Sequence, residues 1–426
     1  MIEKMLKTVK SSSKKRGKNI TIGAVVGMLL SCSAVIKADD YLWLKYDNGI
    51  KFSKDNGAGW KEENPYTENN WNGTTYTNNI RLYGENNDSS TDGYGLKLDT
   101  SRIRINLVNN GIIYGYGDDY VSGTGTGTGI KIESNSTVGE VGNNGIIYGY
   151  GYSSVSGTGI GINIGSSSTV GKLGNNGVIY GNTNAINNDN GTISNGVNYG
   201  LLISKNSSGD VVGGLEIVDE KNKGINKIAN YGLAFTVNGS NYKTKDEYHN
   251  NFGKKIETSE NIVINAAATV SGGAISNIES IKLNNGKLTY ENGSIEKSDL
   301  ISSNETYILN GIEDTLKVSG TGNELNNAVI NAYKTAVNMS AGSNLTLGNT
   351  VINGETTYPV VSMAGDDSIL SIEKNSKING DISSSGKNNE ITISESIING
   401  RISATKDKNN TLNLIGNRDE KKSCYI

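Results

Sequence analysis

Short strings of alternating apolar and polar residues recur along most of the chain. An apolar side chain at every second position places those side chains on one face of a β-strand. Such strings stand at 130–132, 162–164, 345–347 and 391–393, and Gly, Asn and Ser are frequent between them. Because these three residue types favour turns, the pattern predicts many short strands and few helices.

A seven-residue unit, Asn-Asn-Gly-Ile-Ile-Tyr-Gly, gives these strings a period. It stands at 109–115, returns unchanged at 143–149, and returns at 175–181 with Val in place of the first Ile, at spacings of 34 and 32 residues. A fixed period of about 20 to 50 residues is typical of a chain that stacks like units and does not close a single core. We expect Asn-Asn-Gly to turn the chain at a corner. The unit's tyrosines are expected at equivalent positions, namely Tyr114, Tyr148 and Tyr180.

A second series, Ile-Asn-Gly, stands at 352–354, 378–380 and 398–400, at the shorter spacings of 26 and 20 residues. Repeats of this length predict an all-β fold, a right-handed parallel β-helix whose coils lie about 4.8 Å apart. At about 22 residues a coil, residues 96–415 would form about 14 coils and one rod near 70 Å long. Equivalent asparagines would form side-chain ladders along that rod. An antiparallel β-sandwich would leave the recurring segments unexplained.

These patterns divide the chain behind its N-terminal region. Residues 39–95 carry all three Trp and none of the repeats, and we expect them to cap the stack, with an exposed aromatic ligand patch as the alternative. β-Helix repeats of longer period are predicted at 96–244 and repeats of shorter period at 261–415. A charged loop insertion at 245–260 separates the two, and loops of this kind are a favoured place for binding.

Residues 1–38 combine a basic lead with an apolar run that begins at Ile20. The run is short for a membrane span, is interrupted by Gly and Ser, and is followed by the small Ala38, which predicts a cleaved signal peptide with an extended basic n-region. A retained membrane anchor and a lipoprotein signal acylated at Cys32 are the alternatives.

Removal of residues 1–38 changes the charge of the chain. It leaves 32 basic and 42 acidic residues, a net charge of −10, with no basic block. Such a chain lacks the electrostatic footprint of nucleic-acid binding, so no nucleic-acid partner is expected. Cys424 would be the only cysteine left, which excludes a disulfide framework.

Few residues could carry chemistry. His249 is the only histidine and no Gly-x-Ser-x-Gly motif is present, which argues against a catalytic triad and a zinc site. The pairs Asp118 and Asp119, and Asp366 and Asp367, are the nearest candidates for acid–base catalysis or Ca²⁺ binding. Both pairs adjoin Gly and are interpreted as turns. We therefore predict no enzymatic activity, and no catalytic, cofactor-binding or metal-binding residues.

The basic and apolar pattern of residues 5–23 resembles the autotransporter-associated N-terminal region of bacterial surface proteins of the type V secretion class. The Asn- and Gly-rich repeats behind it are similar to the passenger domains of these proteins. The resemblance implies export and passage through an outer-membrane β-barrel translocator. It further implies a cell-surface or extracellular, outer-membrane-associated adhesin or structural stalk with a role in virulence, which binds protein or glycan ligands on host cells or bacteria.

The resemblance stops before the C-terminus. Residues 416–426 form a charged tail, and no series of amphipathic strands of the kind that builds a translocator barrel precedes them. We expect a truncated passenger or a split one, and a split passenger would use a separately encoded translocator. A carbohydrate-active β-helix enzyme, either a polysaccharide lyase or a hydrolase, and a non-functional gene fragment are the alternative functions.

Overall fold

The computed structural model describes residues 20–21 and 41–415, apart from 56, 87–91, 102, 120–124, 154–156, 206–209, 246–247 and 355–356. Strands dominate these residues, and the α-helix among them, α3 (Lys297–Ser302), is six residues long. The predicted all-β, parallel β-helical fold is confirmed. Except for residues 20–21, the predicted signal peptide with Cys32 lies outside the described residues, as does the tail with Cys424.

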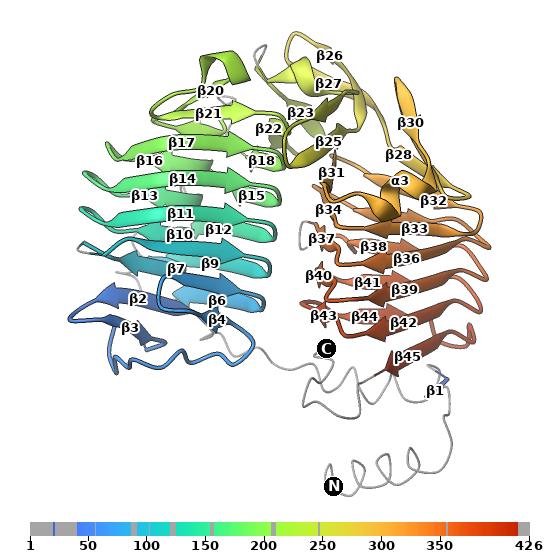
Figure 1. Ribbon diagram of the computed structural model, residues 1–426, viewed down its shortest axis with the longest axis horizontal. Coiled ribbons are helices and arrows are strands. Elements are labelled where there is room, and N and C mark those ends of the chain that lie inside the picture. Colours follow the sequence, from blue (N-terminus) through green and yellow to red (C-terminus); the bar gives the residue numbers. More distant parts are fainter. Residues whose placement is uncertain are drawn as a thin grey trace, which may run out of the picture.

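Three sheets form a first stack of coils over residues 42–243, and one of them continues into two further strands at residues 267–279 (Figure 1). The β10 sheet contains β2 (Leu42–Tyr46), β3 (Ile50–Ser53), β7 (Gly93–Asp99), β10 (Thr126–Ile132), β13 (Thr158–Ile164), β16 (Asn184–Asn188) and β19 (Val212–Gly213). The β11 sheet contains β4 (Asn70–Trp71), β5 (Thr75–Asn78), β8 (Ile105–Asn109), β11 (Thr137–Asn143), β14 (Thr169–Asn175), β17 (Thr192–Asn198), β20 (Glu216–Val218) and β21 (Lys227–Asn230). The β9 sheet contains β6 (Arg81–Asn86), β9 (Ile112–Asp119), β12 (Ile146–Ser153), β15 (Val178–Gly181), β18 (Leu201–Ser204), β22 (Leu233–Asn238), β23 (Asn241–Lys243), β26 (Ala267–Ser271) and β27 (Ala274–Glu279).

Three more sheets form a second stack, residues 261–415. The β34 sheet contains β24 (Lys255–Glu257), β25 (Asn261–Asn265), β31 (Thr306–Gly311), β34 (Ala328–Ala332), β37 (Val351–Asn353), β40 (Lys377–Asn379) and β43 (Ile397–Ile398). The β35 sheet contains β28 (Ile281–Asn284), β29 (Lys287–Tyr290), β30 (Gly293–Ile295), β32 (Leu316–Ser319), β35 (Val337–Met339), β38 (Val361–Met363), β41 (Ile382–Ser384) and β44 (Ile402–Ala404). The β36 sheet contains β33 (Asn323–Asn326), β36 (Asn344–Gly348), β39 (Ile369–Glu373), β42 (Glu390–Ser394), β45 (Thr411–Ile415) and β1 (Ile20–Thr21).

The repeated heptapeptide forms a turn followed by a strand, and its copies lie in register. In parallel pairing, Tyr148 of β12 lies opposite Tyr114 of β9 and Tyr180 of β15. The rings stack, with centroids 4.7 Å apart for Tyr114–Tyr148 and 4.3 Å for Tyr148–Tyr180. The equivalent positions predicted for these tyrosines are therefore confirmed.

Asparagine ladders run along both stacks, as the sequence predicts. In the first stack each side-chain Nδ2 donates to the Oδ1 of the next coil's asparagine over 2.7–2.9 Å, and the ladder consists of Asn78, Asn109, Asn143, Asn175, Asn198 and Asn230. A similar ladder with distances of 2.8–2.9 Å consists of Asn265, Asn310, Asn331, Asn353, Asn379 and Asn399. These buried amides satisfy one another and fix the coil register.

The prediction of one continuous rod is wrong. The chain reverses after β22, and the second stack runs back along the first, so the two lie side by side (Figure 1). Residues 245–260, predicted as a loop insertion, lie at this reversal and contain β24 and the 3₁₀ turn η3 (His249–Asn251). Another 3₁₀ turn, η2 (Glu220–Asn222), precedes β21.

Hydrogen bonds between the stacks record their antiparallel order. The Nδ2 of Asn399 donates to the carbonyl oxygen of Asn79. In the bonds that follow, the donor's residue number in the second stack falls as the acceptor's residue number in the first stack rises. The remaining pairs, at 2.7–3.0 Å, are Asn379 with Asn110, Asn353 with Asn144, Asn331 with Asn176, Asn310 with Tyr199, and Asn265 with Tyr231. Apart from Asn265, each of these asparagines uses one N–H within its own ladder and the other across the interface. Asn265, at the end of the ladder, donates its second N–H to the carbonyl oxygen of Asn251.

Apolar contacts explain why the chain folds back. Ile113 of β9 points into the first stack, whereas Ile112 points outward, yet only 2% of Ile112 is exposed. Ile112 belongs to a cluster that also contains Ile312 and Tyr333 of the second stack. A single rod would leave this outward row in water, and burying it between the stacks is favourable.

Candidate functional site

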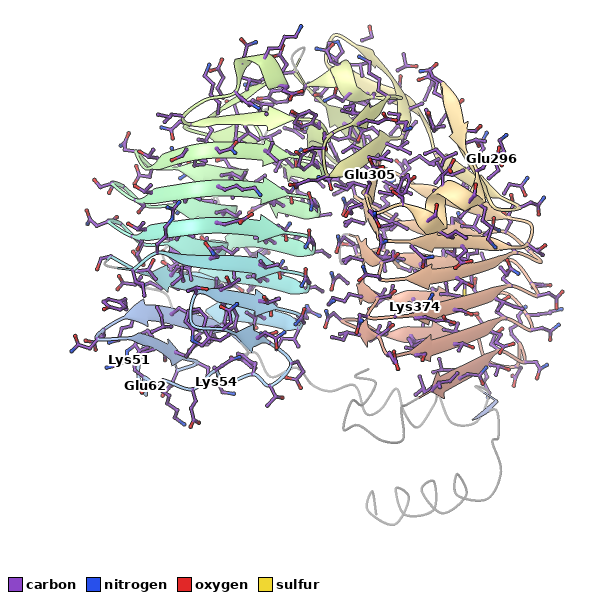
Figure 2. All side chains as sticks on the ribbon, viewed as in Figure 1. Lys51, Lys54, Glu62, Glu296, Glu305 and Lys374 are labelled. Carbon is purple, nitrogen blue, oxygen red and sulfur yellow. The ribbon has the colours of Figure 1, made fainter. Side chains whose placement is uncertain are left out.

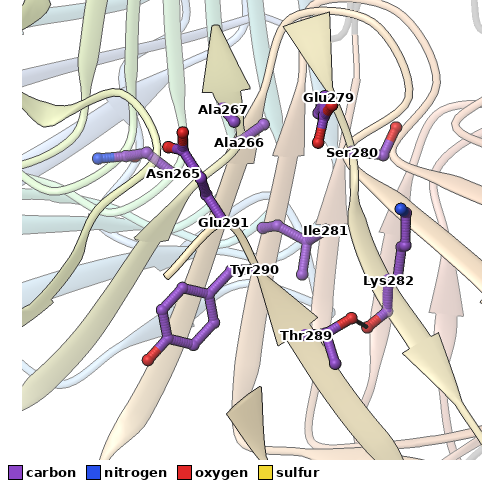
Figure 3. A pocket seen from close by; sticks show the side chains of 10 residues that line it. All are labelled: Asn265, Ala266, Ala267, Glu279, Ser280, Ile281, Lys282, Thr289, Tyr290 and Glu291. Atoms are coloured by element: carbon purple, nitrogen blue, oxygen red, sulfur yellow. Dashed lines mark hydrogen bonds between the residues drawn. The ribbon is translucent and has the colours of Figure 1, made fainter. Parts of the chain in front are cut away.

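A pocket of about 210 Å³ lies beside the reversal, where the second stack begins (Figure 3). It is formed by the end of β25, the start of β26, the end of β27 and the hairpin β28–β29. Its polar side chains belong to Glu279, Ser280, Lys282, Thr289, Tyr290 and Glu291, with Asn265 at its edge.

An Asn-Gly turn builds the hairpin that carries half of these side chains. Asn285 and Gly286 both have positive φ, 49° and 79°, as a two-residue hairpin turn requires. The antiparallel register places Lys282 opposite Thr289. Ile281 and Leu283 point the other way and are buried in the core of the second stack. Lys282 and Thr289 therefore face away from the core, whereas Tyr290, which also lines the pocket, packs against the core of the second stack.

The opposite wall depends on the strand pair β26–β27. Glu279 lies opposite Ala267, and the register of the two strands shifts between Ala267 and Thr269. Such irregularities re-aim side chains and are frequent next to functional sites. The backbone N–H of Ala266 donates to the carbonyl oxygen of Asn310 over 2.7 Å, which ties this wall to the next coil.

The two carboxylates of the pocket come from different walls. In Figure 3 the Glu291 side chain stands on one side, and Glu279 with Ser280 stands on the other. Gly253, with φ at 70°, leaves space for Glu291, because a Cβ at Gly253 would collide with the Glu291 carboxylate. Neither carboxylate takes part in the ion pairs found between described residues.

A second notable surface is the outer face of the β9 sheet. Tyr83 stacks on Tyr114 with centroids 4.9 Å apart, which extends the tyrosine row to four coils. Burial raises the pKa of the hydroxyl groups of Tyr83 and Tyr114 above their usual range. Tyr116 and Tyr150 form a parallel row at 5.9 Å. The rings cover one another's faces, so the row is mainly a packing element.

The turn interpretation of the two acidic pairs agrees with the structure for Asp366 and Asp367 but is wrong for Asp118 and Asp119, which lie at the end of the strand β9. Asp366 accepts a hydrogen bond from the backbone N–H of Lys387 over 2.7 Å, and Asp367, at φ 58°, accepts one from the Asn388 side chain over 2.9 Å. Both bonds link one coil's turn to the next. Asp118 lies in β9 and accepts a hydrogen bond of 3.4 Å from the Tyr116 hydroxyl. The side chain of Asp119 lies outside the described part of the chain.

His249 lies in η3 at the reversal and is not joined to either acidic pair. Within the described residues, no group of three or more His, Cys, Asp or Glu side chains could hold a metal ion. No helix in the same part of the chain is long and apolar enough to cross a membrane.

The pocket residues were not identified from the sequence, because they lie outside the repeated units. The available signal was Asn284-Asn285-Gly286-Lys287, a hairpin turn flanked by alternating strands. Comparison of the chain with models of protein families, with curated proteins and with solved structures gives no match.

Proposed function

We propose that this protein is an exported, surface-displayed β-helical protein that acts as an adhesin and not as a stalk. The observation that carries the proposal is the return of the second stack along the first. A stalk gains about 4.8 Å of reach from each coil, and folding back gives up half of that reach. The doubled arrangement instead provides a broad, stiff body, which suits a binding head.

Rigidity supports the same function. Binding surfaces lose less entropy when their scaffold is already ordered. Here the asparagine ladders and the bonds between stacks hold side faces and corner turns in fixed positions. Corner turns can vary in sequence without disturbing the strands behind them, so they can supply specificity.

The leader and the composition support the proposed location. A basic and apolar N-terminal segment, the resemblance to autotransporter passengers and an acidic mature chain all fit export to the cell surface. Partners would be protein or glycan ligands on host cells or bacteria.

Protease treatment of intact source cells should degrade the protein while cytoplasmic markers survive. Complete protection of the protein would contradict surface display.

Adhesion itself can be tested with the purified chain lacking residues 1–38. Beads coated with this protein should bind to a panel of animal and bacterial cells, and the binding should saturate and be blocked by the soluble protein. Beads coated with an unrelated β-helical protein of similar charge provide the control. Binding no stronger than that of the control beads across the panel would overturn the adhesin function.

A further inference from the structure

We propose that the pocket between β26–β27 and the β28–β29 hairpin binds one neutral sugar residue at the end of a surface glycan. The inference rests on the proposed adhesin function, because it names the class of ligand that such an adhesin would recognise. The size, the side chains, the charge and the position of the pocket support this ligand.

The size of the pocket limits the ligand. Pockets that enclose drug-sized ligands measure about 300–1,000 Å³, whereas this one measures about 210 Å³ and is open on one side. That space suits a single six-membered sugar ring, with the rest of a glycan extending outward. A peptide side chain would fill the volume but would leave most of the polar lining without partners, which is unfavourable.

The lining matches a ligand rich in hydroxyl groups. The Glu279 and Glu291 carboxylates accept hydrogen bonds, the Lys282 ammonium donates them, and the hydroxyl of Ser280 does both. Hydrogen bonds to ionised groups are the stronger kind, so carboxylates on two sides of the pocket can each accept hydrogen bonds from sugar hydroxyls. The half-buried ring of Tyr290 adds an apolar surface for the C–H groups of the sugar.

The charge of the lining selects among sugars. Two carboxylates against one ammonium leave the pocket with a net negative charge. A carboxylate on the ligand would be repelled by both glutamates, and in a partly enclosed site this repulsion is stronger than in water. Neutral hexoses and N-acetylhexosamines carry no such group. Sialic and uronic acids should therefore be rejected.

The position of the pocket suits display. The strands β26, β27 and β28, which line it, lie at the far end of the molecule from β2 and β45 (Figure 1). Its walls are hydrogen-bonded strands. The β28–β29 hairpin packs into the core of the second stack, and β26–β27 packs into the apolar cluster between the stacks. A protein held near the end that contains β2 and β45 would present this pocket outward on a rigid support.

The first test is direct binding to the purified chain lacking residues 1–38. Saturation-transfer NMR and calorimetry would use glucose, galactose, mannose, N-acetylglucosamine and N-acetylgalactosamine, and N-acetylneuraminic and glucuronic acids as the acidic set. At least one neutral sugar should bind with a Kd near 1 mM, as expected of a ligand this small. No binding of any neutral sugar at 50-fold that concentration, or equal binding of the acidic sugars, would overturn the proposal.

Variants test the assignment to this pocket. Glu279→Gln and Glu291→Gln should each weaken the sugar affinity at least tenfold, while Glu62→Gln should leave it unchanged, because Glu62 lies at the opposite end of the first stack (Figure 2). Circular dichroism and the melting temperature check that all three variants fold. Unchanged affinity in both pocket variants would place the sugar elsewhere, and cleavage of an oligosaccharide would identify an enzyme; either result contradicts the proposal.

The same variants separate this proposal from the adhesin function. If beads coated with Glu279→Gln adhere to cells as well as the unchanged protein does, the pocket is not the adhesive site although adhesion stands. If the unchanged protein binds the sugar but its beads never adhere to cells, the pocket assignment holds and the adhesin function fails.

Discussion

Glycine is required where the β9 and β10 sheets approach each other most closely. A Cβ placed on Gly115 would fall onto the carbonyl oxygen of Thr128, and a Cβ on Gly149 would fall onto that of Ile160. These glycines have no positive φ, so the requirement is space and not backbone freedom. It explains why the repeated unit continues as Tyr-Gly-Tyr-Gly, with tyrosine outward and glycine inward.

Replacement of Gly115 should therefore destabilise the protein. Gly115→Ala forces two backbones apart, and overpacking of this kind costs about 3 kcal/mol. Gly142→Ala is the matched control, because its Cβ would lie 3.8 Å from the nearest atom, the carbonyl oxygen of Leu107; we expect a change within about 0.5 kcal/mol. Urea unfolding followed by circular dichroism measures both. Equal stability of the two variants would contradict the close approach of the sheets.

Lys377 interrupts an apolar row at the interface between the stacks. It lies between Val351 and Ile397 on the outward face of the β34 sheet, and burial lowers the pKa of its ammonium. A folded-state pKa below the unfolded value means that the unfolded chain binds more protons between the two values. Stability from this group therefore rises as the pH increases from the folded pKa toward about 10.5.

Lys377→Met should raise the free energy of unfolding at neutral pH, since methionine fills the same space without a charge to desolvate. The stability advantage of the variant should shrink as the pH rises from 8 to 10.5. The exposed Lys317 provides the control, because Lys317→Met should have no comparable effect. A variant less stable than the unchanged protein at pH 7, or an advantage independent of pH, would refute the assignment.

At the scale of the element, asparagines at the ends of β34-sheet strands form hydrogen bonds both to neighbouring coils and to the first stack. Asn353 donates to the Oδ1 of Asn331 over 2.9 Å and to the carbonyl oxygen of Asn144 over 2.8 Å, and it accepts a hydrogen bond from Asn379 over 2.8 Å. Two buried bonds and one part-buried bond therefore converge on one side chain. Removal of that side chain leaves its partners without these hydrogen bonds.

Asn353→Ala should consequently cost about 2–4 kcal/mol, since unpaired buried polar groups are penalised individually. The matched control is Asn338→Ala in the neighbouring β35: Asn338 is half-buried and its side chain donates to Asp314 over 2.9 Å. We expect that control to cost less than about 1 kcal/mol. Comparable losses in the two variants, measured by denaturant unfolding, would show that the bonds between stacks contribute little.

The repeats predicted much of this element structure. The spacing of the heptapeptide predicted parallel coils, the asparagine ladders and the equivalent positions of the tyrosines, because identical residues at a fixed period occupy equivalent positions. The reversal was not predicted. Its signal was the run of adjacent apolar residues, such as Ile112 and Ile113, which indicates burial on both faces of a strand. The sequence does not say what covers the second face.

The candidate pocket escaped prediction for a related reason. Glu279 and Glu291 belong to hairpins at the reversal, where the repeat pattern is interrupted, and they converge only because β27 and β28–β29 are brought together there. Outside the repeats, no regular spacing in the sequence indicates which other residue a carboxylate will lie close to. The turn interpretation of Asp366 and Asp367, by contrast, followed from the neighbouring glycine and agrees with their bonds to the next coil.

At the scale of the whole molecule, the stacks form one body and not two independent repeat arrays. Each stack has its own core, and two further apolar clusters contain residues from both stacks. The bond from Asn399 to Asn79 spans 320 residues of sequence. A simple repeat array has contacts between neighbouring coils only. Contacts of such long range favour slow folding and couple the stability of the two stacks.

The antiparallel, side-by-side arrangement of the two stacks is the central claim, and a distance between their ends tests it most directly. Spin labels would be attached at Thr67→Cys and Arg401→Cys in a chain whose own cysteines are replaced by serine, and the distance would be measured by pulsed electron paramagnetic resonance. Both sites lie within a few residues of the Asn79–Asn399 pair or of its contacts, which predicts a separation below about 30 Å. A single rod of the same coils would place the labels roughly 50 Å apart or more, and a distance in that range would contradict the account.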